Sequence, residues 1–215
     1  MTVHSAADRT GDKRERILSA AERIFARHGF FAAKVSDVAK EAGVADGTIY
    51  LYFKSKDDLL ISLFERRMLE LTEALQEAIK GKAPRDQLRA FIRTYLQKVH
   101  DEPAASEVLT IELRQSSKFM KEYENPAFAD FLRMLGGIIA AAQATGEITS
   151  SIPAHIAARM IFGVLDELAL AWVLAKAPFG GSAAGARPKK FDIVRAADWV
   201  ITLVTTGLED NKESQ

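Results

Sequence analysis

The chain has 215 residues, of which 48% are hydrophobic and 27% charged, and its 29 basic and 29 acidic residues give a formal net charge of zero. A chain of this length can bury a substantial core and can hold one small and one larger domain. The absence of cysteine excludes disulfides and thiolate metal sites, and the four histidines are scattered along the sequence, so we predict no metal site. The neutral balance argues mildly against a partner that is recognised by charge alone, such as nucleic acid.

The start of the chain, MTVHSAADRTGDKRER, lacks the apolar core of a signal peptide and is typical of a flexible polar arm. The longest apolar run, residues 156–175, contains Arg159, Asp166 and Glu167 and is therefore a poor membrane span. We expect a cytoplasmic protein without a membrane partner.

Residues 12–28 predict one amphipathic helix. Ile17, Ala21, Ile24 and Phe25 recur at helical spacing, and Gly29 is a natural stop.

The stretch SDVAKEAGVADGTIYLYF, residues 36–53, has the pattern of a helix-turn-helix. Ser36 is placed to cap the first short helix, and the small Ala39 allows a second helix to cross closely. Gly43 can adopt the left-handed conformation that ends a helix, and Val44 and Ile49 then give the second helix a buried face. We therefore predict that the second helix enters the major groove of DNA. The alternative is a plain helical hairpin with ordinary surface tyrosines.

The outward positions of the second helix are the candidate DNA contacts. Gly47 allows backbone close to a base edge, and the Thr48 hydroxyl suits a phosphate oxygen. Ser55 is expected to cap a further helix, with Asp58 as its capping-box partner, between two lysines that can reach phosphates. The predicted DNA-binding residues are Lys34, Ser36, Ala45, Asp46, Gly47, Thr48, Tyr50, Tyr52, Lys54 and Lys56.

Residues 13–64 resemble the DNA-binding domain of the TetR family of bacterial transcriptional regulators, on the segments AERIFARHGF and VSDVAKEAGVADGTIYLYFKSKDDLL. The resemblance implies a three-helix head, a larger helical domain that dimerises and binds a small effector, and a ligand-controlled repressor that binds operator DNA and is not an enzyme. Many members have Ser or Thr where this chain has Ala45, so we expect Asp46 to cap the recognition helix instead.

The rest of the chain is predicted to be helical, which makes the fold all-α. We divide it into an N-terminal arm and helix-turn-helix domain, residues 1–56, and a helical effector-binding and dimerisation domain, residues 57–215. Glycine and proline positions predict helices over residues 57–80, 85–100, 104–119, 126–146, 153–176 and 191–208, with a loop at 178–188.

The last two predicted helices are apolar nearly all round, which requires burial on several sides. We expect them to form a symmetric four-helix interface in a homodimer, as the TetR resemblance also implies. Two recognition helices about 34 Å apart would then read a near-palindrome. The alternative is that both helices lie in the core of a monomer.

Two later passages, IELRQS at 111–116 and ARMIFGVLDELALAW at 158–172, resemble one subgroup of the TetR family. This subgroup comprises the fatty-acid-degradation repressors of Gram-positive bacteria and Thermus, which respond to long-chain acyl-CoA. The resemblance implies acyl-CoA as the effector and no cofactor.

The residues are compatible with such a ligand, because an acyl chain needs an apolar tunnel and CoA phosphates need arginine or lysine. Arg114 is the strongest single candidate, since it lies in IELRQS, where the chain matches the subgroup. Each apolar candidate has core packing as its alternative, and each basic one a solvated surface. The predicted effector-binding residues are Arg89, Arg93, Leu109, Leu113, Arg114, Lys118, Phe119, Phe128, Leu132, Arg133, Phe162, Leu165 and Asp166.

Two other functions remain open at this point. A TetR-type repressor could sense another apolar molecule, such as a drug. An acyl-CoA carrier without a DNA role is the alternative from another class, although it would have no use for a helix-turn-helix.

Overall fold

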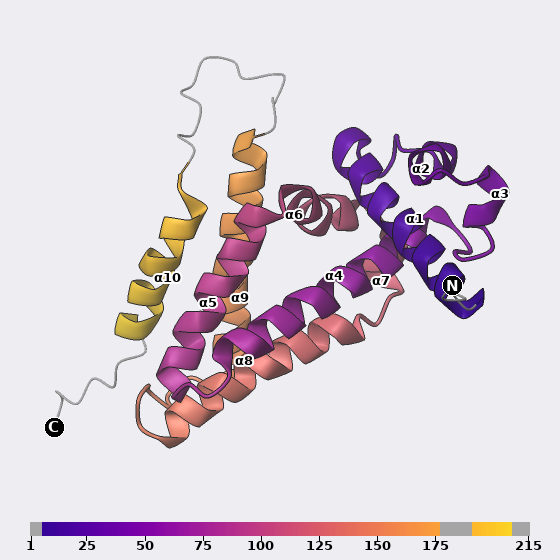
Figure 1. The fold of residues 1–215 in the computed structure, drawn as a ribbon. Helices are drawn as coiled ribbons and strands as arrows, with labels where there is room; N and C mark the ends of the chain where they lie inside the picture. Colours follow the sequence, from indigo (N-terminus) through magenta and orange to yellow (C-terminus); the bar gives the residue numbers. More distant parts are fainter. Residues whose placement is uncertain (1–5, 177–190, 208–215) are drawn as a thin grey trace, which may run out of the picture. The chain divides into compact units, whose positions relative to one another are not determined.

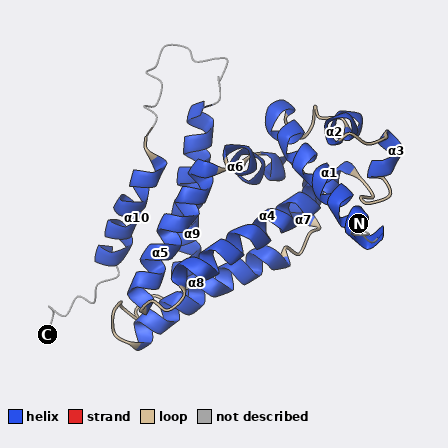
Figure 2. Cartoon of the chain, viewed as in Figure 1, coloured by secondary structure: helices blue, strands red, loops and turns tan. Residues whose placement is uncertain are grey.

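The computed structural model describes residues 6–176 and 191–207, and all regular structure within these ranges is helical (Figures 1 and 2). The described elements are α1 (Ala6–His28), α2 (Val35–Ala42), α3 (Asp46–Ile49), α4 (Lys56–Ile79), α5 (Pro84–Asp101), α6 (Pro103–Thr110), the 3-10 helix η1 (Glu112–Gln115), α7 (Ser117–Lys121), α8 (Pro126–Ala144), α9 (Ala154–Lys176) and α10 (Ile193–Gly207). The predicted all-α fold is confirmed.

Glycines in the left-handed region end several helices, as predicted. Gly29 follows α1 with φ +76°, Gly43 follows α2 with φ +66°, and Gly81 follows α4 with φ +70°. An L side chain is strained at such values, whereas glycine adopts them freely.

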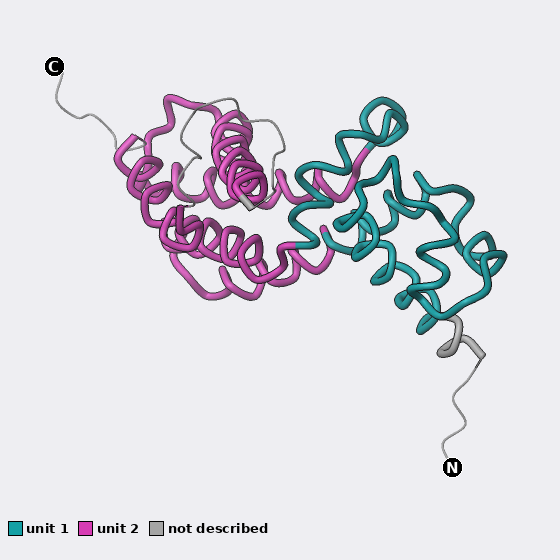
Figure 3. Tube along the Cα trace, turned by 90° about the horizontal axis from the view of Figure 1, so that it is seen from above, with its two compact units in different colours: residues 1–67, 104–124 teal, residues 68–103, 125–215 magenta. Residues whose placement is uncertain are grey.

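The chain forms two compact units (Figure 3). The first unit contains the described residues up to Arg67 together with Ala104–Glu124, and the second contains Met68–Pro103 and the described residues from Asn125 onward. Both include part of α4, which is continuous across the division. The predicted boundary between residues 56 and 57 divides the chain by function rather than by compactness, and it stays a prediction.

In the second unit α5 packs against α8, α9 and α10. Phe91, Phe131 and Leu135 are fully buried in its core. By length and composition α8 could cross a membrane, but the core helix of a soluble protein has the same character. In this unit α8 packs against α5 and α9.

The structure corrects two of the predicted elements. Residues 104–119 do not form one helix, because the chain breaks into α6, η1 and α7 around the buried Glu112. Residues 6–11 were predicted as part of a flexible arm, but they belong to α1, which begins earlier than the predicted helix 12–28. The predicted loop at 178–188 lies outside the described residues.

Candidate nucleic-acid interface and ligand site

The recognition element is longer than α3 alone. The amides of Tyr52 and Phe53 both donate to the carbonyl of Ile49, at 3.0 Å, so helical turns continue to Phe53. Ile49 and Phe53 are each 1% exposed and anchor the element in the head. Gly47 and Tyr50 are exposed and Thr48 and Tyr52 are partly exposed, which is the outward arrangement that the sequence predicted.

The predicted capping of the two short helices is wrong. The N-cap of α2 is Lys34, so Ser36 already lies in the first turn, where its backbone is helical and cannot adopt the extended cap conformation. The N-cap of α3 is Ala45, and Asp46 is the first helical residue rather than the cap. Neither helix has a side-chain cap hydrogen bond. Ser36, Ala45 and Asp46 are nevertheless exposed, so they remain candidates for contact with DNA.

The cap of α4 is confirmed in a modified form. The Ser55 hydroxyl accepts from the amide of Asp58, at 3.1 Å. The Asp58 carboxylate accepts from the amide of Lys54, at 2.7 Å, one residue earlier than a standard capping box.

The predicted basic contacts differ in availability. Lys34 and Lys54 are exposed. The ammonium of Lys56 instead donates to the carbonyls of Phe30, Phe31 and Ala33 at 2.7 to 3.2 Å, and it lies 4.6 Å from the centre of the Phe30 ring. A phosphate contact by Lys56 would have to replace one of these bonds. Its observed role is to hold the turn that precedes α2.

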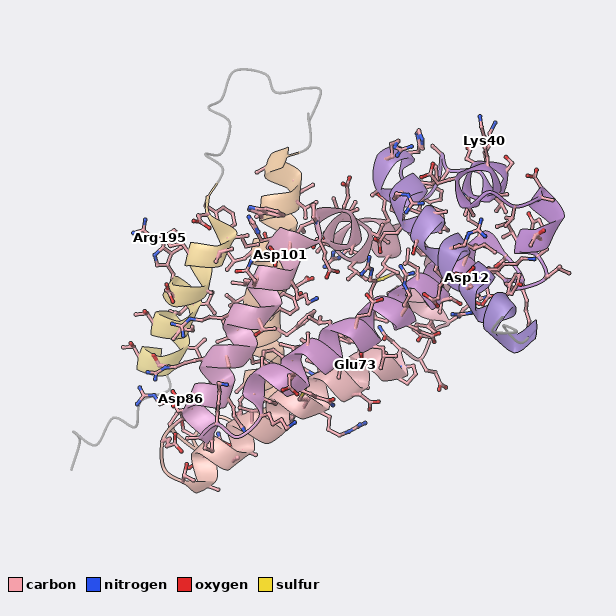
Figure 4. The ribbon with its side chains drawn as sticks, viewed as in Figure 1. Asp12, Lys40, Glu73, Asp86, Asp101 and Arg195 are labelled. Atoms are coloured by element: carbon pink, nitrogen blue, oxygen red, sulfur yellow. The ribbon has the colours of Figure 1, made fainter. Side chains whose placement is uncertain are left out.

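Two exposed residues of the head are not among the predicted DNA contacts. Lys40 extends from α2 away from the rest of the head (Figure 4). Leu51 is 82% exposed, between the two predicted tyrosine contacts. The spacing of two residues from both Ile49 and Phe53 could have identified Leu51, because that spacing places it opposite the buried face.

A buried carboxylate attaches the segment 104–124 to the head within the first unit. Glu112 is 5% exposed, and it accepts from the backbone amide of Phe30 and from the side-chain amide of Gln115. Burial raises the pKa of Glu112, and the bond from Phe30 opposes that rise. We call Glu112 and Phe30 the latch. The latch was not predicted from the sequence, which instead favoured Arg114, an exposed residue on the same turn.

Two further bonds join this segment to α4. The Ser116 hydroxyl donates to Asp57 at 2.6 Å, and the Tyr123 hydroxyl donates to Glu65 at 2.7 Å. Burial, followed by the bond to Glu65, raises the pKa of Tyr123 well above its usual value. The segment is therefore bonded to the turn that follows α1, through the Phe30 amide, and to two carboxylates of α4.

The predicted effector residues divide between the two units. Those in the first unit are Leu109, Leu113, Arg114, Lys118 and Phe119, and those in the second are Arg89, Arg93, Phe128, Leu132, Arg133, Phe162, Leu165 and Asp166. In the first unit Leu113 is buried, and the ring of Phe119 packs edge-on against Phe64 at 5.0 Å. Lys118 is exposed.

In the second unit, aromatic rings bring several predicted apolar residues together. Phe128 and Phe162 meet edge-to-face at 4.8 Å, and both contact the buried Phe131. Phe131 also packs against Phe91 and Tyr95, at 5.3 and 6.1 Å. We call these five residues the ring cluster. Leu165 is fully buried, whereas Leu132 and Asp166 are partly exposed.

The basic candidates of the second unit are engaged in surface ion pairs. Arg93 on α5 pairs with Asp198 on α10 at 3.0 Å, Arg89 pairs with Asp86 at 3.1 Å, and Arg133 pairs with Asp130. Asp86, which Figure 4 labels at the start of α5, and both α5 arginines line an open groove of about 870 Å³ between α5 and α10. The groove is polar and is not the apolar tunnel that the sequence predicted.

The last two helices are less uniformly buried than predicted. Each buries one face in the second unit and exposes apolar side chains on another, namely Ile156 and Met160 on α9 and Val194, Trp199 and Leu203 on α10. Arg195 lies over the Trp199 ring at 5.9 Å. The exposed apolar set is what a partner subunit would cover.

Comparison with known proteins assigns both halves of the chain. Residues 17–63 match the bacterial regulatory proteins of the tetR family, and residues 64–207 match the C-terminal region of YsiA-like proteins within the TetR group. The chain belongs to the TetR family. It is therefore a DNA-binding transcriptional regulator and not an enzyme.

Three matches of this chain to known proteins are informative. The fatty acid metabolism regulator protein of Bacillus subtilis is 34% identical over 195 residues, which cover 90% of this chain and 94% of the relative. The crystal structure of FadR from Bacillus subtilis, in complex with stearoyl-CoA, matches with a TM-score of 0.79 over 91% of this chain and 99% of the other, at 34% identity. FadR from Bacillus halodurans matches with a TM-score of 0.80 at 30% identity, over 91% and 96% of the two chains.

Proposed function

We propose that the protein represses genes of fatty-acid degradation and is released from its operator by long-chain acyl-CoA. The observation that carries the proposal is the likeness, along nearly the whole chain, to a FadR protein that binds stearoyl-CoA. The ring cluster in the second unit supports it, because it gathers apolar surface of the kind that an acyl chain seeks.

DNA recognition is the task of the first unit. The helical turns from Asp46 to Phe53 present their outward face to the major groove, while exposed Lys34 and Lys54 meet phosphates. Two such units in a homodimer read the two halves of an operator, and the exposed apolar faces of α9 and α10 join the subunits.

The effector acts on the second unit. Its rings are closely packed, so an acyl chain has to part Phe128 from Phe162 to enter, which makes this a site that opens on binding. Each methylene that is buried there contributes about 0.8 kcal/mol, which makes affinity depend steeply on chain length. Arg89, Arg93 and Arg133 are the candidate partners of the CoA phosphates in this unit. Arg114, in the first unit, is a separate candidate.

The signal reaches the head along the chain. The segment 104–124 connects α5 with α8 of the second unit, yet its own bonds attach it to the head through the latch and through Asp57. A shift of this segment, or of the continuous α4, moves the recognition element. A coupling free energy of about 1–3 kcal/mol lowers operator affinity roughly 5 to 150-fold.

Calorimetric titration of the purified protein tests the ligand. Stearoyl-CoA is expected to bind at least roughly 100-fold more tightly than octanoyl-CoA, because of its additional buried methylenes, and CoA alone is expected to bind weakly. Equal affinity for all three would contradict an acyl-chain site. An apolar drug that binds while stearoyl-CoA does not would assign the protein to the drug-sensing repressors instead.

A further inference from the structure

Leu51 is an exposed apolar residue in the middle of the recognition element. It is 82% exposed, more than any other large apolar side chain among the described residues. Leaving a leucine in water forgoes the free energy that burial supplies, and none of the surrounding head covers it. Contact with a partner outside the head would explain why a leucine is exposed at this position.

The helical phase places Leu51 directly opposite the core. Ile49 and Phe53 define the buried side, and residues of a helix are roughly 100° apart around its axis. Leu51 then lies roughly 180° from the midpoint of these two residues, whereas Tyr50 and Tyr52 lie to either side of it. Of the residues in this element, Leu51 thus points most directly away from the core of the head.

Gly47 lies one turn before Leu51 on the same face. A Cβ added to Gly47 would meet no atom within 4 Å, so the glycine leaves open space beside the leucine. Thr48, Tyr50 and Tyr52, at neighbouring positions of the element, carry hydroxyl groups and are exposed or partly exposed. The face therefore has an apolar centre and a polar rim.

We propose that Leu51 is a specificity-determining residue that contacts the C5-methyl group of a thymine in the major groove. Among the groups that base pairs present in that groove, the thymine methyl is the apolar one, and aliphatic side chains recognise it by contact. The missing side chain of Gly47 allows the backbone to approach closely enough for the leucine to reach a base edge. The inference rests on the proposed DNA-binding function.

The experiment removes the methyl from the DNA and the leucine from the protein separately. A high-affinity duplex is first selected from a random-sequence pool with the purified dimer, and each thymine is then replaced singly by deoxyuridine, which lacks only the methyl. Fluorescence anisotropy measures the Kd of each duplex for the natural protein and for Leu51→Ala. Leu69→Ala on α4 is the matched control, because Leu69 is also exposed, at 60%.

We expect one thymine in each half-site at which deoxyuridine weakens binding about fourfold, the effect of one buried methyl group. Leu51→Ala should abolish that difference at the same position, while Leu69→Ala should retain it. The thermal midpoint of Leu51→Ala should equal that of the natural protein, since the side chain is exposed. If no thymine responds, or if the response survives in Leu51→Ala, the inference is wrong although DNA binding stands. If no duplex is selected, the proposed function and the inference fall together.

Discussion

At the residue scale, two neighbouring lysines have different environments, although both were predicted from the sequence as phosphate contacts. Lys54 is exposed, whereas the ammonium of Lys56 is bonded to three carbonyls of the turn before α2. Sequence alone could not separate them, because the partners of Lys56 lie more than 20 residues earlier in the chain.

Removing the charge is expected to lower stability at Lys56 and operator affinity at Lys54. Lys56→Met should lower the free energy of unfolding by about 1–3 kcal/mol, because carbonyls lose their donor. Lys54→Met should leave stability unchanged but weaken operator binding and reduce the slope of log K against log salt by about 1 for each subunit. Urea denaturation and anisotropy at several salt concentrations measure both. Identical behaviour of the two variants would contradict the assigned roles.

The burial of Glu112 could not be predicted from the sequence. Glu112 and Arg114 are both charged residues of IELRQS, and only the fold shows that the glutamate is buried against Phe30. Because burial raises its pKa, the ionised form is less favourable in the folded protein than in the unfolded chain.

This shift gives a pH dependence of stability with a definite sign. The stabilisation is fully present below the unfolded pKa of the carboxyl and is lost as the pH rises through the raised folded pKa. Glu112→Gln keeps an acceptor for Phe30 and removes the ionisation. Relative to the natural protein, this variant should therefore gain stability from pH 4 to pH 8, as measured by urea denaturation. Glu122→Gln, which changes an exposed carboxyl, should show no such trend.

At the element scale, local signals were sufficient where a glycine or proline marks a boundary. Gly29, Gly43 and Gly81 end helices as predicted, and Pro126 begins α8. The failures occurred where boundaries depend on distant contacts. No glycine or proline interrupts residues 104–119, and the break there accompanies the burial of Glu112. Likewise α2 begins at Val35, one residue before the predicted cap, next to the turn that Lys56 holds.

Two glycines of the helix-turn-helix are expected to respond oppositely to alanine. Gly43→Ala should destabilise the protein by about 1 kcal/mol or more, since φ is +66° and the new Cβ would lie 3.3 Å from Arg16. Gly47→Ala has open space in a helical turn, so stability should be retained or slightly increased while operator affinity falls. Thermal unfolding and anisotropy on the same samples measure both effects. A Gly47→Ala variant with full DNA affinity would show that the backbone does not approach the bases.

At the scale of the whole molecule, the predicted effector residues do not all belong to one compact unit. The sequence supplied residues of the right chemistry, but the structure divides them between two compact units, and within each unit only some touch. Periodicity identifies which apolar residues share a helix face, not which of them line a cavity. The ring cluster is the part of the prediction that the structure brings together.

Dimerisation is expected to depend on the exposed apolar residues of the last helices. Leu203→Glu introduces a charge into the proposed interface, at an exposed apolar position, and should convert a dimer to a monomer, as measured by light scattering on a sizing column. Operator affinity should fall with it, because one head reads only half a site. Leu69→Glu, at another exposed leucine, should remain dimeric. A Leu203→Glu dimer would place the interface elsewhere.

The central claim is that acyl-CoA releases the protein from DNA. The most direct measurement is the affinity of the dimer for a selected operator duplex, by anisotropy, with and without saturating stearoyl-CoA. The account predicts a loss of affinity of roughly 5 to 150-fold with stearoyl-CoA and little change with CoA alone. Unchanged operator affinity at a stearoyl-CoA concentration that calorimetry shows to be saturating would contradict it.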